Sequence, residues 1–166
     1  MNSTAFIAFG GNLIPDGFDN LEQVMSEAIK DIAKLPLVII AQSALFETAP
    51  VPVSDQPWFI NGVLHVKTDM KPADLLMALH KIEHEFGRVR MVRNEARILD
   101  LDLIDYDGMV FDDEALLLPH PRMHQRAFVL LPLQDVMADW HHPISNKSIE
   151  DLINEMPAGQ QIRKTS

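Results

Sequence analysis

The stretch ILDLDLIDY, residues 98–106, decides how this sequence can fold. Leucine and aspartate alternate through it with the two-residue period of a β-strand. The leucines therefore share one face of the strand, while Asp100 and Asp102 share the other at a Cα separation of about 6.5 Å. We expect a strand that buries its apolar face and presents two carboxylates side by side.

The segments around this strand predict alternating strands and helices. Short apolar runs predict strands over residues 4–9, 37–46 and 59–68. Apolar residues at helical spacing predict helices over residues 18–35 and 72–86. The resulting order β-α-β-β-α-β is the ferredoxin-like pattern, which predicts an α+β fold with a mostly antiparallel sheet and helices packed on one face.

The chain beyond the central strand predicts C-terminal additions to this core. The Asp-Gly pair at residues 107–108 is a hairpin-turn signal, so we expect residues 109–111 to form the second strand of a hairpin. We also expect a helix over residues 127–131 that is interrupted at Pro132, and a last helix over residues 148–156.

Length, composition and charge limit the function classes. The 166 residues predict a single domain at residues 1–158, followed by a frayed tail at residues 159–166. The chain has no cysteine, which excludes a disulfide or a thiolate metal site, and its net charge of −10 argues against electrostatic binding of nucleic acid or an anionic membrane. No apolar run approaches the roughly 20 residues that span a bilayer, and no signal-peptide pattern opens the sequence. We therefore expect a cytoplasmic monomer with neither nucleic acid nor membrane as partner.

Arginines are concentrated around the aspartate strand. Six of the seven arginines lie between Arg88 and Arg126, whereas the lysines are scattered. The guanidinium fork suits bidentate phosphate contacts, and Mg²⁺ commonly binds one or two carboxylates together with phosphate oxygens. This combination predicts an Mg²⁺-polyphosphate site. The alternative is a solvated strand face, with Asp100 and Asp102 exposed beside a solvated basic loop.

The segment from Thr48 to Asn61 predicts a site for a second, flat substrate. Phe59 and Asn61 lie two residues apart on a predicted strand, so their side chains share a face. An aromatic ring can stack on a heteroaromatic ligand while an amide binds the ligand's polar edge. The alternative is an ordinary loop with a half-buried asparagine.

Two other function classes stay open at this point. The segment HKIEH, residues 80–84, matches the H-x-x-E-H pattern of inverted zinc peptidases, although its helix already carries an apolar core stripe. A non-catalytic ferredoxin-like interaction domain is the second alternative. The sequence contains no glycine-rich phosphate-binding motif, so a nucleotide would have to be held by arginines and metal.

Several blocks of the sequence, taken together and in order, resemble the 6-hydroxymethyl-7,8-dihydropterin pyrophosphokinase family. One departure is that Asn94-Glu95-Ala96 stands where this family commonly has Trp-Gly-Pro. The blocks span about residues 5–143 and are AFGGNL at 8–13, FETAP at 46–50, QPWFIN at 56–61, RVR at 88–90, RILDLDL at 97–103 and PHPRMHQRAFVL at 119–130.

The resemblance implies an enzyme of folate biosynthesis. Its reaction would transfer the pyrophosphoryl group of ATP to the hydroxymethyl oxygen of 6-hydroxymethyl-7,8-dihydropterin, giving the pterin diphosphate and AMP. The implied cofactor is Mg²⁺, two ions of which act with ATP and are held by Asp100 and Asp102.

The resemblance also implies roles for individual residues. The residues implied to surround the pterin are Thr48, Pro50, Phe59, Asn61 and Phe128. The residues implied to bind the nucleotide are Glu83, Arg88, Arg90, Arg97, His120 and Arg126. The residues implied to be catalytic are Arg88, Arg97, Asp100 and Asp102.

Overall fold

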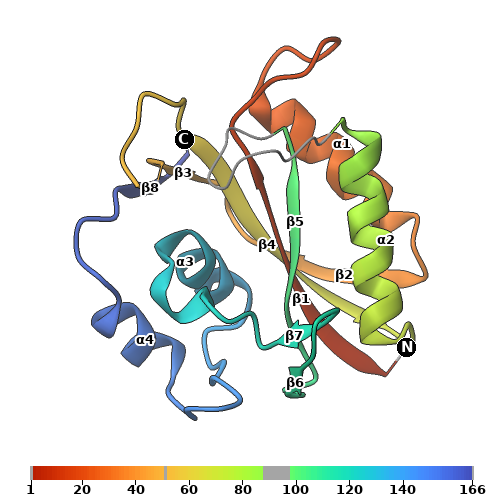
Figure 1. The fold of residues 1–166 in the computed structure, drawn as a ribbon, viewed down its shortest axis with the longest axis vertical. Coiled ribbons are helices and arrows are strands. Elements are labelled where there is room, and N and C mark those ends of the chain that lie inside the picture. Colours follow the sequence, from red (N-terminus) through yellow and green to blue (C-terminus); the bar gives the residue numbers. More distant parts are fainter. Residues whose placement is uncertain (1, 51, 88–97, 166) are drawn as a thin grey trace.

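The computed structural model describes residues 2–50, 52–87 and 98–165 and shows an α+β fold around a six-stranded sheet (Figure 1). The strands are β1 (Ser3–Gly11), β2 (Leu37–Gln42), β3 (Phe46–Thr48), β4 (Phe59–Thr68), β5 (Asp100–Tyr106), β6 (Phe111–Asp112), β7 (Leu117–Leu118) and β8 (Ile162–Lys164). The helices are α1 (Leu21–Ala33), α2 (Pro72–Glu85), α3 (Ala127–Val136) and α4 (Ile149–Glu155), with a short 3₁₀ helix at Met123–Gln125.

The main sheet confirms the predicted ferredoxin-like core. Its strands follow the order β5-β1-β4-β3-β8, with β2 also paired to β4, and every pairing is antiparallel. β4 has the predicted bounds, whereas the run predicted as one strand over residues 37–46 is divided into β2 and the start of β3. The division occurs at Ser43, whose Oγ accepts a hydrogen bond from the Val63 N–H at 2.9 Å and replaces regular ladder pairing.

Helices cover both faces of the sheet, whereas the sequence predicted them on one face only. α1 and α2 pack on a core that contains Ile7, Leu101 and Leu103 (Figure 1). α3 and α4 pack on the opposite side, against a second core that contains Phe6 and Val63. Because successive residues of β1 point to opposite faces and both sets are apolar, both faces need a covering layer.

The hairpin predicted after β5 is correct at its turn but wrong in its second strand. Asp107 and Gly108 adopt the expected positive φ angles of 53° and 68°. The chain that follows does not pair with β5, and β6 instead pairs with β7 in a separate two-stranded sheet. The edge of β5 is used by a later segment, because the His120 N–H donates to the Ile104 carbonyl at 2.9 Å.

The predicted interruption at Pro132 is also wrong, since α3 continues through this residue to Val136. A proline inside a helix removes one backbone hydrogen bond and crowds the preceding turn. In α3 the neighbours Val129, Leu130 and Leu133 are buried against the sheet, so tertiary packing offsets that loss.

The C-terminal tail, expected to fray, forms a strand. β8 pairs with β3, so that Lys164 lies opposite Phe46 and Ile162 lies opposite Thr48. The pairing supplies backbone partners for a segment that has too few apolar residues to be recognised as a strand from its sequence.

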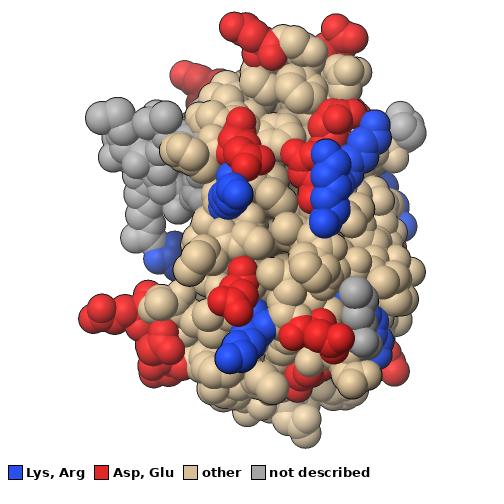
Figure 2. Space-filling model, turned by 90° about the vertical axis from the view of Figure 1, so that its right-hand side faces the viewer, with Lys and Arg blue, Asp and Glu red and all other residues tan. Residues whose placement is uncertain are grey.

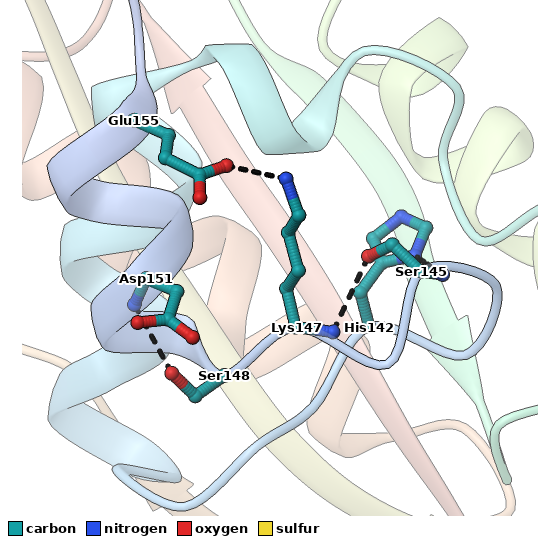
Figure 3. Close-up of polar contacts among 6 residues, drawn as sticks. All are labelled: His142, Ser145, Lys147, Ser148, Asp151 and Glu155. Carbon is teal, nitrogen blue, oxygen red and sulfur yellow. Dashed lines mark hydrogen bonds and ion pairs between the residues drawn. The ribbon is translucent and has the colours of Figure 1, made fainter.

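The start of α4 is fixed by polar contacts. The Ser148 Oγ accepts a hydrogen bond from the Asp151 N–H at 3.1 Å, and Lys147 pairs with Glu155 one helix length away (Figure 3). α3 has no comparable cap from its own N-cap residue, Arg126.

The outer surface of α1 and α2 carries mixed charges. Figure 2 shows lysines beside carboxylates on this side of the molecule, and Lys30 and Lys34 pair with Glu27 and Asp31. Within the residues that the structure describes, none of the helices is long and apolar enough to cross a membrane.

Candidate active site

A cavity of about 560 Å³ lies where β3 ends and β4 begins, beside the first turn of α3. It collects residues that are far apart in the sequence, from β1, β3, β4, β5, α3 and the C-terminal segment. All five residues predicted to surround a flat substrate line it, namely Thr48, Pro50, Phe59, Asn61 and Phe128. The strand that bears the aspartates reaches the same cavity through Asp100.

Asn61 is fixed in the cavity wall by its neighbours. Its Nδ2 donates to the Thr48 Oγ1 at 2.7 Å, and both residues are buried. Gly10 lies opposite Asn61 in the β1–β4 pair, and a Cβ at position 10 would stand only 2.2 Å from the Asn61 Oδ1. Glycine at position 10 therefore lets the amide rest against the backbone of β1 in the cavity wall.

Two aromatic rings line the cavity from different layers of the fold. Phe59 comes from β4, and Phe128 comes from the first turn of α3. The Arg126 guanidinium lies over the Phe128 ring, 5.3 Å from its centroid, so the ring and the cation are positioned together. Aromatic faces, the Asn61 amide and proline-lined walls suit a flat heteroaromatic ligand.

Asp100 and Asp102 share one face of β5, as their spacing predicts. Gly10 lies opposite Asp100 and Ala8 lies opposite Asp102 on the neighbouring strand. Neither aspartate is fully buried. Carboxylate oxygens are ligands that Mg²⁺ prefers, so these two residues could hold such an ion together with phosphate oxygens.

His120 lies close to the charged groups of this region. Its pKa is lowered to about 4, chiefly because burial disfavours the cation and also because Arg126 repels it, while Asp100 acts in the opposite direction. The ring Nδ1 accepts a hydrogen bond from the Arg122 N–H at 3.3 Å. At neutral pH His120 is therefore an uncharged imidazole whose Nε2 carries the proton.

Glu83 lies outside the cavity lining. The residue is buried on α2, and its Oε2 accepts a hydrogen bond from the Leu101 N–H at 2.8 Å. This bond joins α2 to the aspartate strand between Asp100 and Asp102. Glu83 therefore helps to hold the strand that carries both carboxylates.

The arginine loop cannot be placed in this arrangement. Arg88, Arg90 and Arg97, together with the Asn94-Glu95-Ala96 departure, lie outside the described residues.

The zinc alternative receives no support from the structure. In HKIEH, His80 and His84 are exposed while Glu83 is buried. Across residues 2–50, 52–87 and 98–165, no group of three His, Cys, Asp or Glu side chains could hold a metal ion.

Sequence reasoning missed several residues that line the cavity. Gln56, Arg122 and Gln125 lie in its wall, as do residues 157–161, of which residues 159–161 belong to the tail expected to fray. Asn12 gives a second unpredicted link, because its Nδ2 donates to the Gln56 Oε1 at 3.2 Å and joins the loop after β1 to the loop after β3. Asn12, Gln56, Arg122 and Gln125 lie in sequence blocks that resemble the family, but only the fold shows that these blocks meet at one cavity.

Comparison with known proteins places this arrangement in a family. A model of the family described as 7,8-dihydro-6-hydroxymethylpterin-pyrophosphokinase (HPPK) matches residues 6–138. The chain is 37% identical to a 2-amino-4-hydroxy-6-hydroxymethyldihydropteridine pyrophosphokinase of Pseudomonas aeruginosa over 95% of this chain and 94% of that protein. It is 33% identical to the protein of the same name from Haemophilus influenzae, over 96% of this chain and 97% of that protein.

Larger proteins contain a similar domain. The chain is 35% identical to the folic acid synthesis protein fol1 of Schizosaccharomyces pombe over 95% of this chain, but it spans only 21% of that protein. The fold also matches a crystal structure of wild-type Plasmodium falciparum HPPK-DHPS with pteroate, with a TM-score of 0.72 at 15% identity, over 93% of this chain and 44% of that one.

Proposed function

The chain belongs to the 7,8-dihydro-6-hydroxymethylpterin-pyrophosphokinase family, and on that premise we propose that it catalyses the family's reaction in folate biosynthesis. ATP gives its pyrophosphoryl group to the hydroxymethyl oxygen of 6-hydroxymethyl-7,8-dihydropterin, and the products are the pterin diphosphate and AMP. The observation that carries this proposal is the single cavity that gathers Thr48, Phe59, Asn61 and Phe128 beside Asp100.

The pterin occupies the part of the cavity lined by β3, β4 and α3. Phe59 and Phe128 contact its ring faces, while Asn61 and Thr48 bind its polar edge and Pro50 stiffens the adjoining loop. The 2.7 Å bond between Asn61 and Thr48 supports this assignment, because it fixes the amide before the ligand arrives.

Asp100 and Asp102 would hold Mg²⁺, two ions of which would accompany ATP. The metal would neutralise phosphate charge where the pyrophosphoryl group is transferred. The two carboxylates lie on one face of β5, neither is fully buried, and Asp100 lines the cavity, which together support this assignment.

ATP would bind beside the aspartate strand and Arg126, with its β-phosphate directed toward the pterin. Arg126 contacts phosphate oxygens, and neutral His120 donates from Nε2. Arg88, Arg90 and Arg97 are assigned to the phosphates by the family motif, and Arg88 and Arg97 act with the two aspartates as the catalytic residues. Glu83 is assigned to the nucleotide by the same motif, in addition to its bond to the Leu101 N–H.

The reaction needs positioning and charge stabilisation rather than a covalent intermediate. The hydroxymethyl oxygen forms a bond to the β-phosphorus of ATP, and the bond from that phosphorus to the oxygen bridging to the α-phosphate breaks. AMP leaves with that oxygen, and the hydroxymethyl proton passes to solvent or to a phosphate oxygen. Arginines around the phosphates stabilise the charge that develops during transfer.

The proposed setting is a cytoplasmic monomer whose partners are ATP and the pterin, with no nucleic acid or membrane partner. The net charge of −10 and the mixed charges over α1 and α2 in Figure 2 support the exclusion of polyanions.

Identification of the nucleotide product tests the proposal. The protein is incubated with ATP, Mg²⁺ and the dihydropterin alcohol, and nucleotides are separated by ion-exchange chromatography. We expect AMP to form in proportion to the pterin diphosphate and only when the alcohol is present. Formation of ADP, or of AMP without the alcohol, would contradict the proposed reaction.

A further inference from the structure

The chain after α4 crosses the side of the cavity before it joins the sheet. Residues 157–161 line the cavity, and β8 then lies beside β3 with Ile162 opposite Thr48 (Figure 1). The match to the family model ends at residue 138, so this segment lies outside it.

On the β3 side, the segment fixes the wall that carries Thr48. The Ala49 N–H donates to the Gln161 carbonyl at 3.0 Å. The Arg163 Nε donates to the Glu47 Oε2 at 2.8 Å, and the same guanidinium lies over Trp58, 5.1 Å from the ring centroid. Backbone and side-chain contacts therefore hold both ends of the loop that follows β3.

On the α3 side, one side chain of the segment completes the start of the helix. The Gln160 Oε1 accepts a hydrogen bond from the Ala127 N–H at 2.9 Å. Its Nε2 donates to the Gln125 carbonyl at 2.9 Å and to the Pro157 carbonyl at 3.2 Å. The first N–H groups of a helix have no partner inside it, and Arg126 provides no side-chain cap. Gln160 therefore caps α3 from 33 positions away in the sequence.

The capped residue stands between two side chains of the cavity. Ala127 is the first residue of α3, and its neighbours Arg126 and Phe128 both line the cavity and contact each other. A shift of the Ala127 backbone would move both side chains together. The segment thus holds the α3 wall and the β3 wall at a fixed separation.

We propose that residues 157–164, the C-terminal clasp, are part of the pterin site and that Gln160 is a positioning residue within it. Gln160 fixes the positions of the Arg126 and Phe128 side chains, because it accepts the hydrogen bond from the Ala127 N–H between them. The inference rests on the proposed pyrophosphokinase function and extends it to a segment beyond the family-model match.

The substitution Gln160→Ala tests the positioning role. We expect the dissociation constant for the pterin, measured by fluorescence with a non-hydrolysable ATP analogue present, to rise about tenfold, with a similar rise in the KM for the pterin. The matched control is Gln42→Ala, because Gln42 is exposed at the end of β2 and its side chain makes no hydrogen bond to any described residue. The control should bind pterin like the unchanged protein.

Pterin affinity separates a positioning role from a purely structural one. A lower melting temperature for Gln160→Ala with unchanged pterin affinity well below that temperature would overturn the proposal. If Gln160→Ala does not fold, Arg163→Ala carries the test, since it keeps all three Gln160 bonds and loosens the β3 side. An at least threefold weaker pterin affinity supports the clasp, and unchanged affinity overturns it.

The unchanged protein distinguishes failure of the clasp from failure of the proposed function. If it neither binds the pterin nor forms AMP, the proposed function fails and the clasp fails with it. If it binds and turns over the pterin while Gln160→Ala behaves like Gln42→Ala, only the clasp is wrong.

Discussion

The substitution Gly10→Ala should weaken pterin binding although glycine has no side chain with which to contact a ligand. A Cβ at position 10 would lie 2.2 Å from the Asn61 Oδ1 and 3.0 Å from the Ile60 carbonyl oxygen. The Ile60 oxygen belongs to the hydrogen-bonded backbone of β4 and cannot shift easily. The Asn61 side chain, which is the closer of the two contacts, therefore has to move away from the new Cβ. A normal contact distance requires a displacement of about 1 Å, about the tolerance of a hydrogen bond.

The displacement has a cost that can be worked from the contacts. Moving the amide breaks its 2.7 Å bond to the Thr48 Oγ1 inside a buried site. Leaving a buried polar group without its partner costs about 2 kcal/mol. If the pterin then meets a misplaced amide, the same energy corresponds to about a thirtyfold higher KM for the pterin.

A neighbouring glycine provides a matched control. A Cβ at Gly62 would lie 2.3 Å from the Phe9 ring, in the core beneath the opposite face of the sheet. Gly62→Ala should therefore lower the melting temperature without a comparable change in the KM for the pterin. Steady-state kinetics with varied pterin at saturating ATP, together with thermal unfolding, measure both quantities.

The reasoning is refuted if Gly10→Ala keeps an unchanged KM for the pterin, or if Gly62→Ala raises that KM as strongly. A further check is the double substitution Gly10→Ala with Asn61→Ala. In this double variant the side chain at position 61 no longer carries the amide that would clash with the Cβ at position 10. The loss of stability should therefore be smaller than the sum of the losses in the two single variants.

Three further predictions concern the aspartate strand and its surroundings. Asp100→Asn or Asp102→Asn should lower turnover about a thousandfold while pterin affinity is retained, and kinetics with near-normal turnover would contradict their metal role. Since the folded pKa of His120 is about 4, below its unfolded value of 6.5, its contribution to stability is present above pH 6.5 and is lost as the pH falls toward 4. Urea unfolding should show a weaker decline over that range in His120→Gln, and an identical decline would show that another group is responsible. Glu83→Ala should destabilise the fold by about 1–3 kcal/mol, because the Leu101 N–H loses its acceptor, and an unchanged urea midpoint would exclude that role.

The parts of the fold that could be predicted from sequence are those with a local pattern. β4 was recognisable as an apolar run of strand-forming residues, and α2 was recognisable because its apolar residues recur at helical spacing over 14 residues. The alternation in β5 likewise placed Asp100 and Asp102 on one face. The same alternation along β4 correctly placed Phe59 and Asn61 on one face of that strand.

The errors arose where a distant segment decided the local structure. The hairpin after Asp107 fails because the chain at His120 takes the edge of β5. α3 continues through Pro132 because packing on the sheet offsets a lost hydrogen bond. β8 forms because β3 offers it an edge, not because of its own strand propensity.

The ferredoxin-like order, the paired carboxylates and the shared face of Phe59 and Asn61 could be predicted from sequence, because each depends on spacing along single elements. The packing of α3 on the second face of the sheet and the pairing of β8 with β3 became visible only in the folded chain. The bonds of Gln160 to Ala127 and of Asn61 to Thr48 join segments that are separated in sequence, and the wall of the cavity depends on both. Such contacts carry no local periodicity, so they exist only once hydrophobic burial on both faces has brought the layers together.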